Sequence, residues 1–406
     1  MRIREVLMFL SLIFCVAPMK AQDVDLCEGQ DWFAQMKVRP MQLCKGVLEA
    51  AFNNTTNAIS DLQRVIGKDP KGPEAYRAHE VLLEMDFRQG RYRDALSHAD
   101  TMLALRPGAT DITDLRPLLS ALSSYPNFTI HRKRSILPYI PTSDQNPHFA
   151  VRAEDREGLF YADTGANISV MSDAEALALG LAIRSVESKM GDIGGSSISL
   201  RVAEVNILRI GKCTLRHVAF VVVPVSQPPF NEVPVHQQAI LGIQVLLALN
   251  RIQVSEDGRI ELAGPRKSVG GFTSIAFDQS QPVIQMDFDG KPMLYTMDTG
   301  AIHTTLNPPF GETFPAEIHR GKAEDHKLTG VGGDTSQPSI SLDRLRFTLA
   351  GNEVVLSPAV VLLKKTTAES SWAAGNLGYD LIRQTTPFMI DFEQMTFRSE
   401  RGVHNR

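Results

Sequence analysis

A four-residue motif that occurs twice constrains the fold of this 406-residue chain more than any other feature. Asp-Thr-Gly-Ala stands at residues 163–166 and again at 298–301, 135 residues further on. Two other pairs recur in the same order at nearly the same offset: Gly194-Gly195 with Gly332-Gly333, and Leu241-Gly242 with Leu377-Gly378. Three landmarks at one spacing indicate a tandem duplication of the whole C-terminal segment, because chance would repeat only one short string.

Both copies are predicted to be rich in β-strands that form hairpins. The expected strands are His148–Arg152, Leu159–Ala162, Val283–Phe288 and Met293–Met297. A turn ending at Glu157-Gly158 is expected in the first hairpin, and Asp289-Gly290 is a strong turn signal in the second. Each motif aspartate therefore follows the second strand of its hairpin.

A short helix is predicted after the first motif and not after the second. Ser172-Asp-Ala-Glu175 is a capping box that opens a helix toward Leu179. The second copy has Asn307-Pro-Pro at the corresponding place, which predicts a lost or shortened helix.

The region from Asp31 to about Ser124 is predicted to be helical, and residues 75–107 resemble a tetratricopeptide repeat. The positions that carry this resemblance are Tyr76, Gly90, Tyr92, Ala95, Ala99 and Pro107, with a second helix over Tyr92–Leu105. Ala58 precedes Pro70 by the same twelve residues as Ala95 precedes Pro107, which suggests one and a half to two repeats. Such repeats rarely stand alone, so we expect this region to pack on the rest of the chain or on a protein partner. A plain helical pro-segment without a binding role is the alternative.

Residues 125–147 contain four prolines and the basic run His131–Arg134, which marks a domain boundary. The run is either a processing site or a solvated face. The expected division is a signal peptide over 1–21, a helical region over 22–124, a linker over 125–147, and two β-rich domains over 148–264 and 265–406.

The N-terminus is typical of an export signal. Arg2 and Arg4 precede an apolar run over Val6–Ala17, with a cleavage site expected after Ala21. Twelve residues are too few to span a bilayer, so no membrane span is expected in the mature chain. This predicts a periplasmic or secreted protein; an uncleaved anchor, or a lipid on Cys15, is the less favoured alternative.

Cysteine content and charge exclude other classes of site. After signal removal three cysteines remain, of which Cys27 and Cys44 are able to pair in an oxidising compartment, while Cys213 is best interpreted as a small core residue. No zinc-type ligand spacing occurs, so neither a metal nor another cofactor is expected. The net charge of -4 gives no basic footprint for nucleic acid.

Two aspartates held face to face by separate loops are able to hydrolyse a peptide bond without a metal. Such a pair shares one proton, so that one carboxylate acts as a base and the other as an acid. Gly165 and Gly300 would permit the close approach of the two loops. The hydroxyl groups of Thr164 and Thr299 would form hydrogen bonds from one loop to the other. The two Leu-Gly pairs are expected on strands that pass behind the loops.

With these motifs, residues 148–399 resemble the retropepsin-like aspartic peptidases, as two copies fused in one chain like the pepsin-like enzymes. The resemblance implies a mostly β, bilobal fold preceded by a small α-helical domain. It implies that Asp163 and Asp298 are catalytic, supported by Ala166 and Ala301. It also implies two glycine-rich flaps that close over an extended peptide substrate. The flap residues are Gly191, Asp192, Ile193, Gly194 and Gly195 in the first copy, and Gly330, Val331, Gly332 and Gly333 in the second.

Two departures from the pepsin pattern bear on the chemistry. Ala166 and Ala301 stand where pepsin-like enzymes often have serine, so each carboxylate lacks one hydroxyl donor. We therefore expect a raised dyad pKa and activity that extends toward neutral pH. His303 is expected to be a surface or hydrogen-bonded residue, although a charged imidazole near Asp298 would perturb the dyad. The competing function is a non-catalytic peptide-binding or scaffold protein that uses the helical repeats and the cleft.

Overall fold

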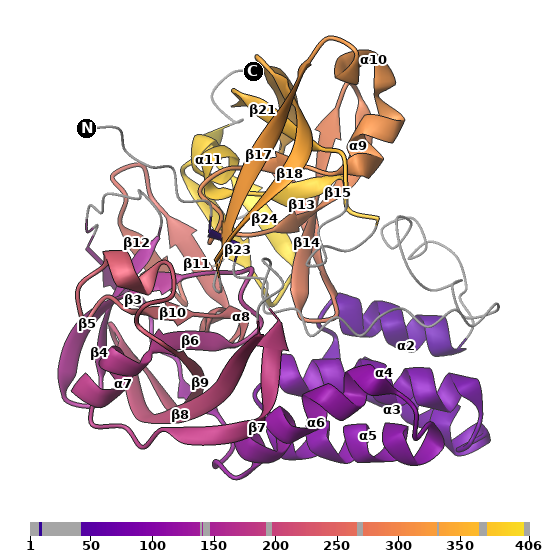
Figure 1. Ribbon diagram of the computed structural model, residues 1–406, viewed down its shortest axis with the longest axis vertical. Helices are drawn as coiled ribbons and strands as arrows, with labels where there is room; N and C mark the ends of the chain where they lie inside the picture. The colour runs from indigo at the N-terminus through magenta and orange to yellow at the C-terminus, as the bar shows by residue number, and fades with distance from the viewer. Residues whose placement is uncertain are drawn as a thin grey trace.

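The computed structural model describes residues 8–9, 42–138, 140, 147–191, 197–265, 271–330, 333–364 and 372–401. The chain is mostly β, with an N-terminal helical region, as the sequence predicts. Figure 1 shows the helices side by side against the lower β-rich part, with a second β-rich part above. We call residues 42–123 the helical unit, residues 147–249 the first β-unit, and residues 271–364 with 372–401 the second β-unit.

Five helices make up the helical unit, and each packs on the next. They are α2 (Gln42–Ala51), α3 (Thr55–Lys68), α4 (Pro73–Arg88), α5 (Tyr92–Leu105) and α6 (Thr110–Ser123). The bounds of α5 are those that the sequence predicts. Ala58 and Ala95 are both fully buried, so small side chains lie where neighbouring helices approach most closely.

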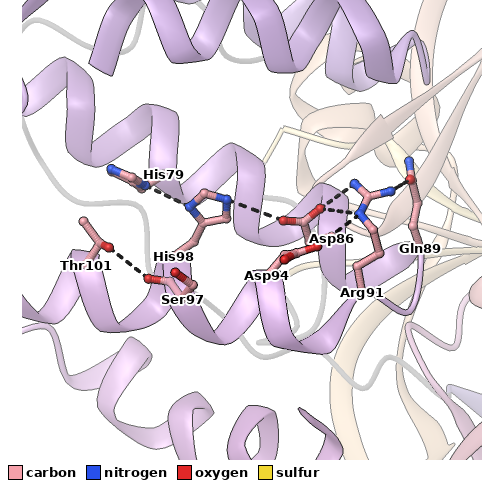
Figure 2. A network of polar contacts seen from close by, with 8 residues as sticks. All are labelled: His79, Asp86, Gln89, Arg91, Asp94, Ser97, His98 and Thr101. Atoms are coloured by element: carbon pink, nitrogen blue, oxygen red, sulfur yellow. Dashed lines mark hydrogen bonds and ion pairs between the residues drawn. The ribbon is translucent and has the colours of Figure 1, made fainter. Parts of the chain in front are cut away.

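A polar network joins α4 to α5 inside the helical unit (Figure 2). Asp86 accepts a 2.7 Å hydrogen bond from Arg91 Nε, and its other oxygen lies 3.5 Å from His98 Nε2. The second ring nitrogen of His98 lies 2.9 Å from Nδ1 of His79. Burial lowers the pKa of His98 to about 4 and raises the pKa of Asp86 to about 6. Both rings are therefore neutral near pH 7, and one ring donates to the other.

The first β-unit is a closed barrel. Its strands are β4 (His148–Ala153), β5 (Arg156–Ala162), β6 (Ser169–Ser172), β7 (Arg184–Gly191), β8 (Ser197–Ile210), β9 (Cys213–Val223) and β10 (Ala239–Leu241). The order β9-β6-β10-β5-β4-β8 closes because β8 also pairs with β9, and β7 extends β8 as a hairpin arm. Helices α7 (Asp173–Ala178) and α8 (Ile243–Leu249) follow β6 and β10.

The second β-unit repeats the central pairings of the first. Its strands are β13 (Gly271–Asp278), β14 (Gln281–Phe288), β15 (Lys291–Met297), β16 (Thr305–Leu306), β17 (Lys322–Gly330), β18 (Gly333–Leu342), β19 (Leu345–Leu349), β20 (Asn352–Leu356), β21 (Ala359–Leu362) and β22 (Gly375–Leu377). The path β15-β22-β16-β21 alternates parallel, antiparallel and parallel pairing. The path β5-β10-β6-β9 of the first unit has the same alternation. Helices α9 (Pro308–Thr313), α10 (Pro315–Ile318) and α11 (Tyr379–Ile382) complete the unit.

A sheet that extends from β13 of the second β-unit, which we call the shared sheet, crosses two of the expected domain boundaries. Strands β24 (Thr396–Ser399), β23 (Phe388–Asp391), β11 (Arg251–Val254), β12 (Ile260–Leu262) and β3 (Ser135–Leu137) continue from β13 in that order. Residues 251–262, expected in the first domain, thus lie in the sheet of the second unit. The predicted linker is also paired: β2 (Thr129–His131) lies on β9, and β3 lies on β12. Its prolines are compatible with this because none of them lies within β2 or β3.

The basic run His131–Arg134 is bonded to the β-rich part of the chain. Arg132 Nε donates to the carbonyl of Ala248 at 2.5 Å, and Arg134 forms an ion pair with Glu261 at 2.5 Å. All four residues of the run are nevertheless exposed, which agrees with the solvated face, and the processing site stays a prediction.

Two local predictions about turns and helices need correction. The first hairpin turns at Glu154-Asp155, with φ of +50° at Glu154, and not at Glu157-Gly158. Gly158 lies within β5, where a Cβ atom would come 3.0 Å from the carbonyl of His236, so the glycine permits close backbone approach. The helix after Asn307 is not lost, since α9 has six residues like α7. Proline is compatible with the first helical turn because its missing N–H would have no partner there.

The other local predictions agree with the structure. The second hairpin turns at Asp289-Gly290, where both residues have positive φ. Ser172 Oγ caps α7 by accepting from the backbone N–H of Glu175 at 2.9 Å.

The helical unit is docked on both β-units through buried contacts. Arg88 is 2% exposed, donates to the carbonyls of Gln279 and Ala50, and lies over the ring of Phe277. Tyr92 donates to Gln244 of α8 at 2.7 Å. Helix α6 packs along β7 of the first β-unit. Of the two expectations for this region, the structure therefore supports packing on the rest of the chain.

Most of the predicted export signal lies outside the described residues. The exception is β1 (Met8–Phe9), which pairs in parallel with Thr329 and Gly330 at the end of β17. Within the described residues, no helix combines the length and the apolar character needed to cross a membrane.

Candidate active site

The two motif loops, residues 163–166 and 298–301, are held in equivalent ways by the two Leu-Gly strands. The backbone N–H of Asp163 donates to the carbonyl of Leu241 at 3.0 Å, and that of Asp298 donates to Leu377 at 3.0 Å. The side chains of Asp163 and Asp298 are almost completely buried, with 0% and 1% exposed. The same strand-to-loop contact thus delivers one carboxyl group from each β-unit into the interior.

Four hydrogen bonds made by two threonines join the motif loops. Thr164 N donates to Thr299 Oγ1 and Thr299 N donates to Thr164 Oγ1, each at 3.0 Å. The Thr164 hydroxyl donates to the carbonyl of Met297 at 2.7 Å, and the Thr299 hydroxyl donates to that of Ala162 at 2.8 Å. Each hydroxyl therefore accepts from the opposite motif loop and donates to the end of the strand that leads into that loop, so the two loops are locked to each other.

Glycine is required where the loops meet. A Cβ atom on Gly165 would lie 2.6 Å from the carboxyl carbon of Asp298, and one on Gly300 would overlap the carboxyl group of Asp163. Behind the loops, Gly242 and Gly378 are equally crowded: a Cβ atom would lie 2.7 Å from the carbonyl oxygen of Ala166 or from the carbonyl carbon of His303. The motif and Leu-Gly glycines thus bring both carboxyl groups and the strands behind them into contact.

The two carboxyl groups differ in the donors that surround them. Asp298 Oδ1 accepts from the N–H groups of Gly300 at 2.8 Å and Ala301 at 2.9 Å, and Asp298 Oδ2 accepts from Asn376 Nδ2 at 2.9 Å. Asp163 Oδ1 accepts from the N–H of Gly165 at 2.7 Å, and the N–H of Ala166 also donates to the Asp163 carboxyl group. No donor for Asp163 Oδ2 is present in the part of the chain that the structure describes.

Burial raises the pKa of both aspartates. The pKa of Asp163 is raised well above its ordinary value, first by burial and then by the charge of Asp298. The pKa of Asp298 is raised by burial, while the hydrogen bond from Asn376 acts to lower it. Two negative charges so close together in an apolar setting repel each other strongly. The pair is therefore most stable when it holds one proton between the two carboxyl groups.

Asn376 is a site residue that the sequence interpretation missed. It stands immediately before Leu377-Gly378, where the first copy has Ile240, and the sequence interpretation assigned no role to that position. The signal was a polar residue on a short strand that is buried throughout. Ser169 and Thr304 were missed too: their hydroxyls accept from the N–H of Gly242 at 3.1 Å and of Gly378 at 2.9 Å.

His303 does not contact the dyad. Its Nδ1 atom lies 3.9 Å from Asp380 Oδ2, and its side chain is 42% exposed. Asp380 is fixed in turn by the N–H and hydroxyl groups of Thr304. This agrees with the expected surface role.

The flap motifs lie at the ends of two hairpins, and only part of each is described. Strands β7 and β8 pair as far as Gly191 and Ser197, and β17 and β18 pair as far as Gly330 and Gly333. Asp192, Ile193, Gly194, Gly195, Val331 and Gly332 lie outside the described residues, so their roles stay predictions.

Two cysteines, Cys44 and Cys213, lie among the described residues. Cys213 is free and fully buried, as a core residue, and its thiol lies 3.3 Å from the carbonyl of Lys133. Cys44 is disulfide-bonded; Cys27 lies outside the described residues, so the pairing of these two stays a prediction. Within the described ranges, no group of three or more His, Cys, Asp or Glu side chains is arranged to hold a metal ion.

A comparison with protein families gives a match over part of the chain. Residues 149–245 match the family model described as Aspartyl protease. This segment contains Asp163 and the first Leu-Gly pair. No curated protein matches the chain.

Solved structures with some similarity come from bacteria and plants. A retropepsin-like aspartic protease from Rickettsia conorii is 15% identical, covering 34% of this chain and 94% of its own, with a TM-score of 0.23. Basic 7S globulin from soybean is 11% identical, covering 68% and 98%, with a TM-score of 0.38. Conglutin gamma, a basic 7S globulin from lupine seeds, is 11% identical, covering 66% and 95%, with a TM-score of 0.37.

Proposed function

We propose that this chain is an aspartic endopeptidase of retropepsin-like type, with two fused copies forming a bilobal enzyme and Asp163 and Asp298 as its catalytic dyad. The observation that carries the proposal is the pair of buried carboxyl groups on two loops locked by Thr164 and Thr299. The matching strand pairings around the loops and the Aspartyl protease match over residues 149–245 support it.

The dyad would hydrolyse a peptide bond in two steps. The ionised aspartate takes a proton from water while the water oxygen bonds to the peptide carbonyl carbon, and the protonated aspartate gives its proton to the carbonyl oxygen. The resulting diol then collapses. The C–N bond breaks as the nitrogen receives the proton taken from water, and a diol hydroxyl returns a proton to the other aspartate. No charge builds up beyond the single one that the pair carries throughout.

The substrate proposed is a peptide bound in an extended conformation against the flaps. The edge of β17 at Thr329 and Gly330 pairs with Met8–Phe9 as an added strand, an example of an extended segment bound through this edge. We also propose export to the periplasm or the exterior, which the disulfide at Cys44 supports because disulfides persist in oxidising compartments.

We also propose that the helical unit is tetratricopeptide-like. Its buried contacts with both β-units through Arg88 and Tyr92 favour a structural role, in which the helical unit stabilises the two β-units. A protein partner would then bind the faces of the helices that these contacts leave free.

Cleavage of a mixed peptide library between pH 3 and 8 tests the proposal. We expect the full chain to cleave, and Asp163→Asn and Asp298→Asn each to lower kcat/KM by at least about a thousandfold. Asp391→Asn is the matched control: Asp391 is equally buried but accepts from Glu393 and Gln394 in the shared sheet, so cleavage should persist.

Cleavage that survives both dyad substitutions would overturn the mechanism. A full chain that binds library peptides but cleaves none at any pH would favour the non-catalytic scaffold instead.

A further inference from the structure

We propose that Asn376 is a positioning residue that keeps Asp298 ionised and so places the shared proton of the dyad on Asp163. The inference rests on the proposed peptidase function and adds a direction to its proton transfers. Asp298 would be the base that receives the water proton, and Asp163 would be the acid that protonates the carbonyl oxygen.

The contact between Asn376 and Asp298 favours the ionised state of Asp298. Asn376 Nδ2 lies 2.9 Å from that oxygen, and the asparagine is 3% exposed, so water does not compete for the contact. An amide NH₂ group donates and does not accept. A proton on Oδ2 directed at Nδ2 would place two hydrogens against each other, so the contact favours an unprotonated oxygen.

The orientation of the amide is held by Thr296. The Thr296 hydroxyl donates to Asn376 Oδ1 at 2.5 Å, which directs Nδ2 toward the dyad. Thr296 and Asn376 are direct partners in the parallel pair β15–β22, so the backbone sets their distance. The carboxylate of Asp298 thus has three fixed donors, from Gly300, Ala301 and Asn376, and hydrogen bonds of this kind stabilise a charge.

The first β-unit lacks this arrangement at the same position. Ile240 pairs with Tyr161 in β10–β5 as Asn376 pairs with Thr296 in β22–β15. Isoleucine offers no donor, and the Tyr161 hydroxyl is directed away to the carbonyl of Gly300. Asp163 Oδ2 has no donor among the described residues and is free to carry a proton.

The electrostatics act in the same direction as the geometry. Burial raises the pKa of both aspartates, but the charge of Asp298 raises that of Asp163 further, whereas Asn376 opposes the rise at Asp298. The hydrogen bond between the two carboxyl groups also raises the pKa of Asp163 and lowers that of Asp298. Among the other donors that the structure describes around the dyad, Asn376 is the one without a counterpart at Asp163.

The pH dependence of cleavage by the full-length Asn376→Ile variant tests this inference. The substitution copies the first β-unit. Loss of one donor to a buried charge should move the lower limb of the kcat/KM profile up by about one to two pH units. Thr296→Val keeps the amide but removes the hydroxyl that orients it, so a smaller shift in the same direction is expected. Asn307→Leu is the control, because Asn307 is equally buried in the second β-unit but contacts the carbonyl of Ala373.

A second measurement does not depend on activity. Titration of the full chain labelled with ¹³C at the aspartate carboxyl carbons should show Asp298 ionising at lower pH than Asp163, and Asn376→Ile should narrow that gap by about one unit. A purely structural role for Asn376 would lower the rate equally at all pH values and leave both titrations unchanged.

The outcomes separate this inference from the proposed function. One outcome would overturn the role of Asn376 and leave the proposed function standing. In that outcome cleavage depends on both aspartates, but Asn376→Ile and Thr296→Val change neither the lower limb of the kcat/KM profile nor the aspartate titrations. Asp163 ionising before Asp298 would overturn it as well, whether or not the chain cleaves. Should Asn376→Ile not fold, the shift in Thr296→Val decides.

Discussion

The hydroxyl of Tyr161 donates a 2.6 Å hydrogen bond to the carbonyl of Gly300, so a strand of the first β-unit supports the motif loop of the second. Tyr161 is 4% exposed, and its ring packs edge-on against His148. The contact fixes the backbone of the loop directly beside Asp298. The two aspartates are therefore aligned by more than the threonine bonds alone.

Tyr161→Phe should lower the free energy of unfolding by about 1–3 kcal/mol, because the buried carbonyl of Gly300 loses its donor. Cleavage should also fall, since the loop beside Asp298 gains freedom. Tyr295→Phe is the matched control: Tyr295 is fully buried, and its hydroxyl has no hydrogen-bond partner among the described residues, so stability should stay equal or rise. Chemical denaturation of the three proteins makes the comparison. Equal losses in both variants would refute the role given to Tyr161.

Cleavage should persist toward neutral pH. The rate requires one proton on the dyad, so its upper limb follows the protonated member, and its lower limb follows the ionised one. Burial and the neighbouring charge raise the pKa of Asp163 well above its ordinary value, which moves the upper limb to higher pH. A kcat/KM profile confined to strongly acid pH would contradict this expectation.

Arg88→Met should loosen the helical unit from the second β-unit. The arginine donates to the carbonyls of Gln279 and Ala50, and methionine keeps the apolar stem but leaves both carbonyls buried without that donor. We expect a loss of about 3 kcal/mol in the free energy of unfolding. Arg93→Met, at a surface bond to the carbonyl of Ser123, should change stability by less than about 0.5 kcal/mol. If Arg88→Met changed the free energy of unfolding as little as Arg93→Met, the docking of the helical unit would not depend on Arg88.

Acid should weaken the helical unit through His98. Its pKa is about 4 in the folded chain, against 6.5 for an ordinary histidine, because burial and His79 disfavour the charged ring. The folded state therefore binds fewer protons, and this contribution is complete above pH 6.5 and is lost as the pH falls toward 4.

His98→Gln should flatten the dependence of stability on pH between 6.5 and 4. The raised pKa of Asp86 acts in the opposite direction, so the difference between the parent and the variant isolates the histidine. His319→Gln, at an exposed position, should reproduce the parent curve. Parent and His98→Gln curves that run parallel would contradict the proposed protonation state of the network.

The sequence predicted the features of the site that depend on duplication and missed those that depend on a difference between the copies. Repeated strings locate Asp163, Asp298 and the glycines because both copies need the same loop geometry. Asn376 has no counterpart in the first copy, so a repeat-based interpretation passed over it, although its contact makes the two carboxyl groups unequal.

Local misinterpretations had tertiary causes. Gly158 resembled a turn glycine but serves the close approach of the His236 carbonyl, which lies far away in the sequence. The proline-rich segment resembled a free linker, yet its strands β2 and β3 find partners in β9 and β12. Neither partner is visible from local composition, because pairing across the sheets is decided by the whole fold.

The docking of the helical unit has a consequence for how this protein would mature. A protease that cut within His131–Arg134 would leave the two fragments associated. Arg88 and Tyr92, which precede the cut, form non-covalent contacts with residues that follow it. The fragments would separate only in denaturant. Activation by release of the N-terminal part would thus require these buried contacts to break as well as the covalent link.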